Sequence, residues 1–165
     1  MDLGKIRVIM SNDVCGYILP CFDKDTEEAM DTYISNCDVG ISKITVQELY
    51  NFPLQPALTD DTFSFLIGDR PGYPNATYLI DYDEYDPQEN NIGFPAGAKE
   101  RLNILLDVLE DMFRVANAQK MVVAITECNQ IETIKKIKLS EMRDIIHADF
   151  EEYQAPPDTL YEITP

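Results

Sequence analysis

The run from Asp81 to Asp86 contains the residue types whose spacing suggests the most definite chemistry in this chain. It reads Asp-Tyr-Asp-Glu-Tyr-Asp, so four carboxylates and two phenols follow one another without a basic residue. Carboxylates attract and pair with Lys or Arg of a partner, and tyrosine rings provide rigid contact area at protein interfaces. We therefore predict a docking site for a basic partner protein, formed by Asp81, Tyr82, Asp83, Glu84, Tyr85 and Asp86.

The same run allows two other interpretations. It begins like a calcium-binding loop, but Tyr85 replaces the third ligand, Asp86 replaces the turn glycine, and Ile92 stands where the closing glutamate belongs. We therefore expect no metal site and no cofactor. In the second interpretation, alternate tyrosines of an expected strand over 77–82 face the core while the acids face solvent. That alternative stays open.

The charge balance of the whole chain limits its partners. There are 30 acidic and 13 basic residues, which gives a formal net charge of -17. Binding to nucleic acids or anionic membranes depends on clustered Lys and Arg, so we expect neither here. The only basic patch is Lys135, Lys136 and Lys138. The same acidic field speeds encounters with cationic partners, although solubility alone would also explain it.

Length and composition predict one globular domain. The chain has 165 residues, 45% of them hydrophobic, and its 7 Phe and 9 Tyr argue for a packed interior despite the charge. The four cysteines include no Cys-x-x-Cys pair of the kind that marks zinc or redox sites. The first residues contain no apolar stretch of signal-peptide length, and no run of about 18 apolar residues occurs that would span a membrane. We expect a cytoplasmic protein with a domain over 1–154 and an extended C-terminal tail over 155–165.

Hydrophobic periodicity predicts three helices. The clearest covers about 98–118, where apolar residues recur at three- and four-residue steps and Arg101 falls on the solvated face. A second covers about 140–153, with Ser140 as its expected cap. A shorter N-terminal helix follows Asp23 and ends near Asn36. Thr45 and Glu48 resemble a capping box that would start a short helix over 46–51.

Strands and helices do not alternate strictly, so the sequence predicts an α+β fold with a mainly antiparallel mixed sheet packed by the two principal helices. Two hairpins are expected, one joining 63–67 to 77–82 and one joining 121–126 to 131–139. A loop without periodicity is expected over 83–98. The remaining expected strands cover 5–10 and 17–22.

Catalytic patterns are scarce, and we predict that the chain is not an enzyme. It contains one histidine, His147, whose helix face also carries Arg143 and Glu151 at four-residue spacing. Neither a phosphate-binding glycine motif nor a nucleophile with a neighbouring base is recognisable. A small hydrolase that uses carboxylates with His147 is the alternative, and it requires two acids or a cysteine beside this histidine.

Taken together, these features predict a binding protein that occludes the active cleft of a basic partner. In size and charge the chain resembles bacterial immunity proteins, which are small acidic proteins that neutralise toxins such as nucleases. No motif carries this resemblance, so no residue role is transferred from it. An acidic adaptor subunit is a further alternative, and the sequence leaves the oligomeric state open.

Overall fold

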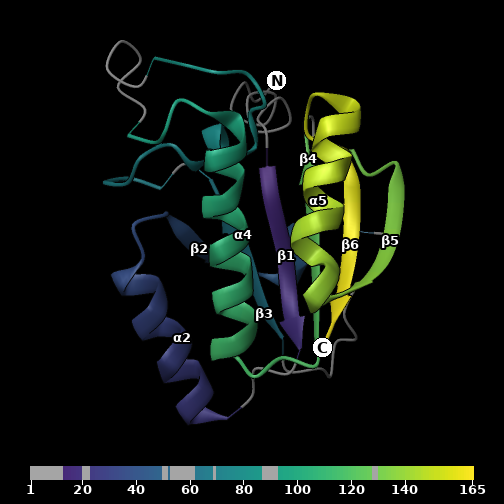
Figure 1. The fold of residues 1–165 in the computed structure, drawn as a ribbon. Helices are drawn as coiled ribbons and strands as arrows, with labels where there is room; N and C mark the ends of the chain where they lie inside the picture. Colours follow the sequence, from purple (N-terminus) through teal and green to yellow (C-terminus); the bar gives the residue numbers. More distant parts are fainter. Residues whose placement is uncertain are drawn as a thin grey trace, which may run out of the picture.

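A computed structural model describes residues 13–19, 23–49, 52, 62–68, 70–86, 93–127 and 130–165. The strand expected over 5–10 lies outside these residues, and so does the end of the one expected over 17–22. The described chain forms a mixed six-stranded sheet with three α-helices, which confirms the α+β class. Figure 1 shows all three helices in one layer on the same face of the sheet.

The sheet has the strand order β2-β3-β1-β4-β6-β5, and all neighbours are antiparallel except the parallel pair β5 and β6. The strands are β1 (Asp13–Leu19), β2 (Ile41–Ile44), β3 (Phe63–Ile67), β4 (Lys120–Thr126), β5 (Thr133–Lys138) and β6 (Thr159–Thr164). The helices are α2 (Lys24–Asn36), α4 (Ala98–Val115) and α5 (Leu139–Tyr153), with 3-10 helices η1 (Val46–Leu49) and η2 (Ala76–Ile80).

The helices begin and end close to where the sequence places them. The side chain of Asp23 caps α2 by accepting a hydrogen bond from Thr26 N at 2.7 Å. Glu48 closes the capping box by accepting from Thr45 N at 2.7 Å, and η1 follows as a single 3-10 turn. In α5 the N-cap is Lys138, not the expected Ser140, and Glu141 accepts from its backbone N–H at 3.1 Å.

Helix α4 supplies most of the helical side of the core. Its buried residues recur at three- and four-residue steps as the sequence predicted, and burying each large apolar side chain contributes about 1.5–3 kcal/mol. The core between helices and sheet also includes Met30 of α2 and Ile146 and Phe150 of α5. A smaller cluster covers the opposite face of the sheet and contains Cys15, Tyr17, Leu49, Phe52, Val122, Ala124 and Leu160.

The C-terminal third is organised differently from the expectation. The expected hairpin between β4 and β5 is wrong, because β6 lies between them and pairs with both. Residues 133–164 instead form a β-α-β unit in which α5 crosses from β5 to its parallel neighbour β6, the usual way to connect parallel strands. The segment expected as a tail over 155–165 is extended, but 159–164 form an interior strand of the sheet.

The segment over 77–82 is also not a strand, so the expected hairpin with β3 is wrong as well. The Asn75 side chain accepts hydrogen bonds from the backbone N–H and the hydroxyl of Thr77, at 3.0 and 2.6 Å, and starts η2. This local cap outweighs the β-branched and aromatic composition that suggested a strand. Leu79 and Ile80 pack into the main core, and η2 lies against α4.

Candidate docking site on the acidic loop

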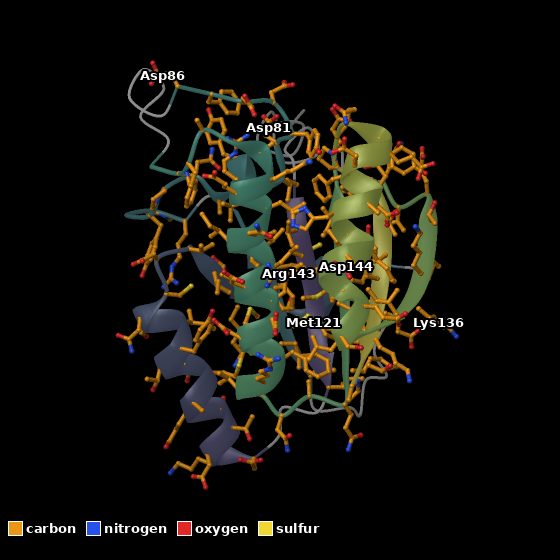
Figure 2. The ribbon with its side chains drawn as sticks, viewed as in Figure 1. Asp81, Asp86, Met121, Lys136, Arg143 and Asp144 are labelled. Carbon is orange, nitrogen blue, oxygen red and sulfur yellow. The ribbon has the colours of Figure 1, made fainter. Side chains whose placement is uncertain are left out.

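Residues 81–86, here called the acidic loop, follow η2 and lie near the N-terminal end of α4. Figure 2 places Asp81 beside that end of the helix and Asp86 farther out on the loop. Asp83, Glu84 and Asp86 are exposed, whereas Asp81, Tyr82 and Tyr85 are half-buried. The outward surface of the loop therefore consists mainly of carboxylates.

Arg101 of α4 lies beneath the acidic loop and holds its backbone. Its side chain is completely buried, with 0% exposure, so the expectation that Arg101 faces solvent is wrong. Its guanidinium donates hydrogen bonds to five backbone carbonyls. They belong to Tyr78 (3.0 Å), Pro95 (2.8 Å), Ala96, Asp81 (3.0 Å) and Asp83.

This arrangement satisfies a buried cation without a direct ion pair. A guanidinium has five N–H donors in a fixed fork, and a buried charge is tolerated only when it is well hydrogen-bonded. Burial lowers the pKa of Arg101, and the nearby Asp81 opposes that shift, so the group stays charged. Because three of the five carbonyls belong to residues 78–83, the cation fixes the path of the first half of the acidic loop.

The two tyrosines of the loop bond within the protein. The Tyr85 hydroxyl donates to the Asp81 carboxylate, and the ring meets Tyr78 edge-on with centroids 5.2 Å apart. The Tyr82 hydroxyl donates to Glu151 of α5, and its ring lies 6.1 Å from that of Phe150. The phenols therefore brace the loop through both their hydroxyls and their rings.

Burial and these carboxylates change the acidity of the phenols. Burial, with the hydrogen bond to Glu151, raises the pKa of Tyr82 to about 12. Burial and the Asp81 carboxylate likewise raise the pKa of Tyr85 above its usual value. Conversely, the hydrogen bond from Tyr82, helped by Lys99, lowers the pKa of Glu151. Both phenols are neutral donors at neutral pH, and Glu151 is ionised.

A hollow of about 550 Å³ adjoins the acidic loop, between the first turn of α4 and the end of α5. Lys99 and Glu151 form an ion pair across it at 3.6 Å, with both side chains more than half exposed. Sequence reasoning did not assign Glu151 or Arg101 to the site, because both act across elements far apart in the chain. The hollow is lined by Tyr82, Glu84, Gly97, Ala98, Lys99, Glu100, Glu151 and Gln154.

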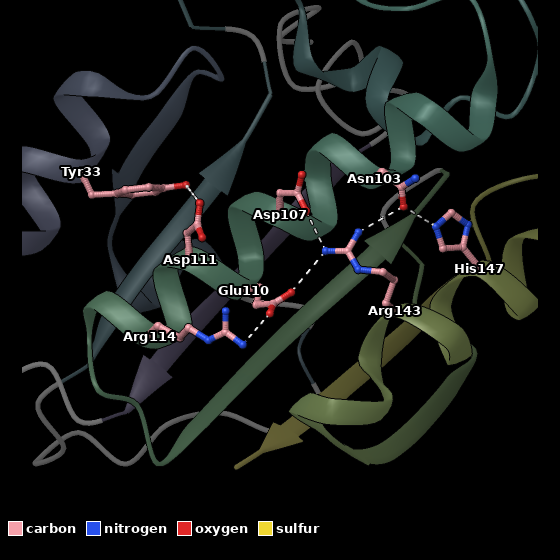
Figure 3. Close-up of polar contacts among 8 residues, drawn as sticks. All are labelled: Tyr33, Asn103, Asp107, Glu110, Asp111, Arg114, Arg143 and His147. Carbon is pink, nitrogen blue, oxygen red and sulfur yellow. Dashed lines mark hydrogen bonds and ion pairs between the residues drawn. The ribbon is translucent and has the colours of Figure 1, made fainter.

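His147 of α5 bonds to Asn103 of α4 across the seam between the two helices. Its Nε2 is 2.7 Å from Asn103 Oδ1, which also accepts a hydrogen bond from Arg143 Nη1 at 3.1 Å (Figure 3). Because arginine only donates, the amide oxygen must face both groups, so His147 carries its proton on Nε2. Arg143 continues the seam by donating to Asp107 at 2.7 Å and to Glu110 at 3.2 Å.

Among the residues that the structure describes, no carboxylate or thiol is hydrogen-bonded to His147. Its hydrogen-bond partner is an amide, and burial, Arg143 and Lys99 lower its pKa. Within the part of the chain that the structure describes, no three His, Cys, Asp or Glu side chains are grouped to hold a metal ion. Across the same residues, no helix has the length and apolar character needed to cross a membrane.

No protein-family model, curated protein or solved structure matches this chain. What the acidic loop does must therefore be argued from its own geometry and charge.

Proposed function

We propose that this chain is an acidic binding protein that inhibits a basic partner by covering the partner's active cleft. The most specific form of the proposal is an immunity protein that neutralises a bacterial nuclease-type toxin in the cytoplasm. One observation carries it: the completely buried Arg101 holds the backbone of the acidic loop while Asp83, Glu84 and Asp86 remain exposed.

Preorganisation makes the acidic loop suited to binding. Association requires that loops and side chains be ordered, and this ordering opposes binding when the free loop is mobile. Here Arg101 ties residues 81 and 83 to α4, while Tyr82 ties the loop to Glu151 of α5. The backbone that carries Asp81, Tyr82 and Asp83 is thus held in place before a partner arrives.

The charge of the loop fits a partner that normally binds phosphates. Enzymes acting on nucleic acids need clustered Lys and Arg, and exposed carboxylates can occupy those cationic positions. The net charge of -17 would speed the encounter with such a surface. Because both contributions are electrostatic, the interaction should weaken as salt rises.

The test is to capture the product of a neighbouring toxin-like gene with the tagged chain and measure its affinity from low to high salt. The double variant D83N/E84Q removes two exposed charges and should weaken binding about tenfold at low salt, since each exposed charge pair contributes up to about 1 kcal/mol. The matched variant E28Q/D31N changes one Asp and one Glu that are exposed on α2. If both variants weaken binding equally, or if salt has no effect, the acidic loop is not the docking site.

A further inference from the structure

β5 forms one edge of the sheet and carries a concentration of positive charge. It has β6 as its one described neighbour. Three of its six residues are lysines, namely Lys135, Lys136 and Lys138, in a chain that has 13 basic residues. Figure 2 shows Lys136 projecting from this outer edge, on the side of the molecule away from the acidic loop.

The two edge strands of the sheet differ in length and in how many of their backbone groups are bonded by side chains. At the other edge, β2 has four residues, and Arg70 Nη1 donates to the Ile41 carbonyl at 2.8 Å. β5 has six residues, and among the described residues a side chain reaches its backbone only at its last position, where Glu141 caps Lys138. Edge strands present unpaired backbone groups that can hydrogen-bond to an added strand. Of the two edges, β5 is the longer and more open one.

The side chains of β5 that face away from α5 form a simple pattern. Alternate residues of a strand share a face, which places Ile134, Lys136 and Lys138 together. Ile134 is 45% exposed, although it lies beside Leu160 of the buried cluster on this face of the sheet. The apolar surface thus continues to the sheet edge and ends there in solvent.

The positive charges on this face are incompletely balanced. Glu162 is 2.9 Å from Lys120 but 3.9 Å from Lys136, whose side chain is 81% exposed. Lys138 forms no ion pair with any residue that the structure describes. Lys136 and Lys138 border a hollow of about 320 Å³, which is also lined by the carboxylates Glu141 and Glu162.

The inner neighbour of β5 shows which pattern of side chains complements this face. In the register of the parallel pair, Ile134 lies beside Leu160, Lys136 beside Glu162, and Lys138 beside Thr164. We propose that the outer edge of β5 binds an extended acidic segment of a partner protein as an additional strand. That segment places an apolar residue beside Ile134 and carboxylates beside Lys136 and Lys138.

Strand addition explains both affinity and selectivity. Backbone hydrogen bonds hold the added strand, and its alternate side chains determine which sequence fits. The lysines repel a basic strand, and they also repel a second copy of β5, which would bring lysines close to lysines. The same charges therefore protect the edge from pairing with another copy of the chain and select an acidic segment. This surface is separate from the acidic loop and does not depend on the function proposed for it.

The test titrates the labelled protein with a synthetic peptide of sequence Thr-Leu-Thr-Glu-Thr-Glu-Thr and follows amide chemical shifts by NMR. Shifts should move along 133–138, and K136E/K138E should weaken binding about tenfold or more. The matched variant K24E/K43E, which changes exposed lysines of α2 and β2, should bind normally, and a peptide with lysine in place of glutamate should not bind. Absence of shifts at millimolar peptide, shifts confined to other elements, or equal binding by both variants would overturn the proposal. A concentration-dependent dimer abolished by K136E/K138E would also overturn it, because a second copy would then occupy the edge.

Discussion

The Cζ atom of Arg101 lies 5.1 Å from the centre of the Tyr85 ring, so the buried cation of α4 is in direct contact with the acidic loop. The same guanidinium donates to the carbonyls of Asp81 and Asp83, and the Tyr85 hydroxyl donates to the Asp81 carboxylate. Backbone, ring and carboxylate are thereby fixed around one side chain. The acidic loop should consequently be a rigid part of the domain.

Replacing Arg101 by methionine should lower the free energy of unfolding by about 3 kcal/mol or more, because buried carbonyls lose their donors. Urea denaturation measures this loss. The control R114M removes an exposed arginine that pairs with Glu110 at 2.7 Å, and should change stability by less than about 1 kcal/mol. Equal effects of the two variants would mean that Arg101 is not the main support of the loop.

Replacing Tyr82 by phenylalanine should raise the pKa of Glu151, because the hydroxyl that now stabilises the carboxylate is lost. Side-chain NMR titration of Glu151 measures the change directly. Y153F is the matched control, since Tyr153 is exposed at the end of the same helix. An unchanged pKa in Y82F would show that the loop and α5 are not linked through this hydrogen bond.

His147 should make stability depend on pH below neutrality. Burial lowers its pKa from the ordinary value of 6.5, and the positive charges of Arg143 and Lys99 lower it further. The negative charge of Asp144 opposes this lowering. The unfolded chain therefore takes up the proton first, so this contribution to stability is complete above about pH 6.5 and is lost as the pH falls toward the folded pKa. Thermal unfolding from pH 7.5 to 5 should show a smaller loss for H147Q than for the wild type. Parallel curves would contradict this role.

Asp149 is a buried carboxylate, 4% exposed, that joins three elements of the C-terminal unit. It pairs with Lys135 of β5 at 2.6 Å and accepts from the Tyr161 hydroxyl of β6 at 2.7 Å. K135M should lower the free energy of unfolding by about 2 kcal/mol or more, because it leaves a buried charge without its cation. The control K136M removes an exposed lysine whose ion pair is longer. It should change the free energy of unfolding by less than about 0.5 kcal/mol in the same denaturation experiment.

Local patterns allowed much of this fold to be predicted. The apolar repeat of α4, the Asp23 cap of α2 and the short apolar strands β3 and β4 each depend on residues close together in the sequence. The position of β6 between β4 and β5 depends on pairing between distant segments, which periodicity does not encode. The prediction of a strand over 77–82 was wrong because the local cap at Asn75 outweighed the strand-forming composition of the segment.

The candidate site was predictable only where it depends on residues that are close together in the sequence. Composition alone identified the acidic run and its exposed carboxylates. It could not identify Arg101, whose place in the helix pattern suggested exposure to solvent, because the carbonyls that surround it come from two separate segments, 78–83 and 95–96. Nor could it show that Tyr82 binds Glu151, which lies 69 residues away in the sequence.

Hydrogen exchange of the backbone amides, measured with and without the captured basic partner, tests the central claim most directly. If the acidic loop is the docking surface, the partner should slow exchange in residues 81–86 and in the first turn of α4, and D83N/E84Q should reduce that protection. Protection confined to other elements, with exchange in the acidic loop unchanged, would contradict the account.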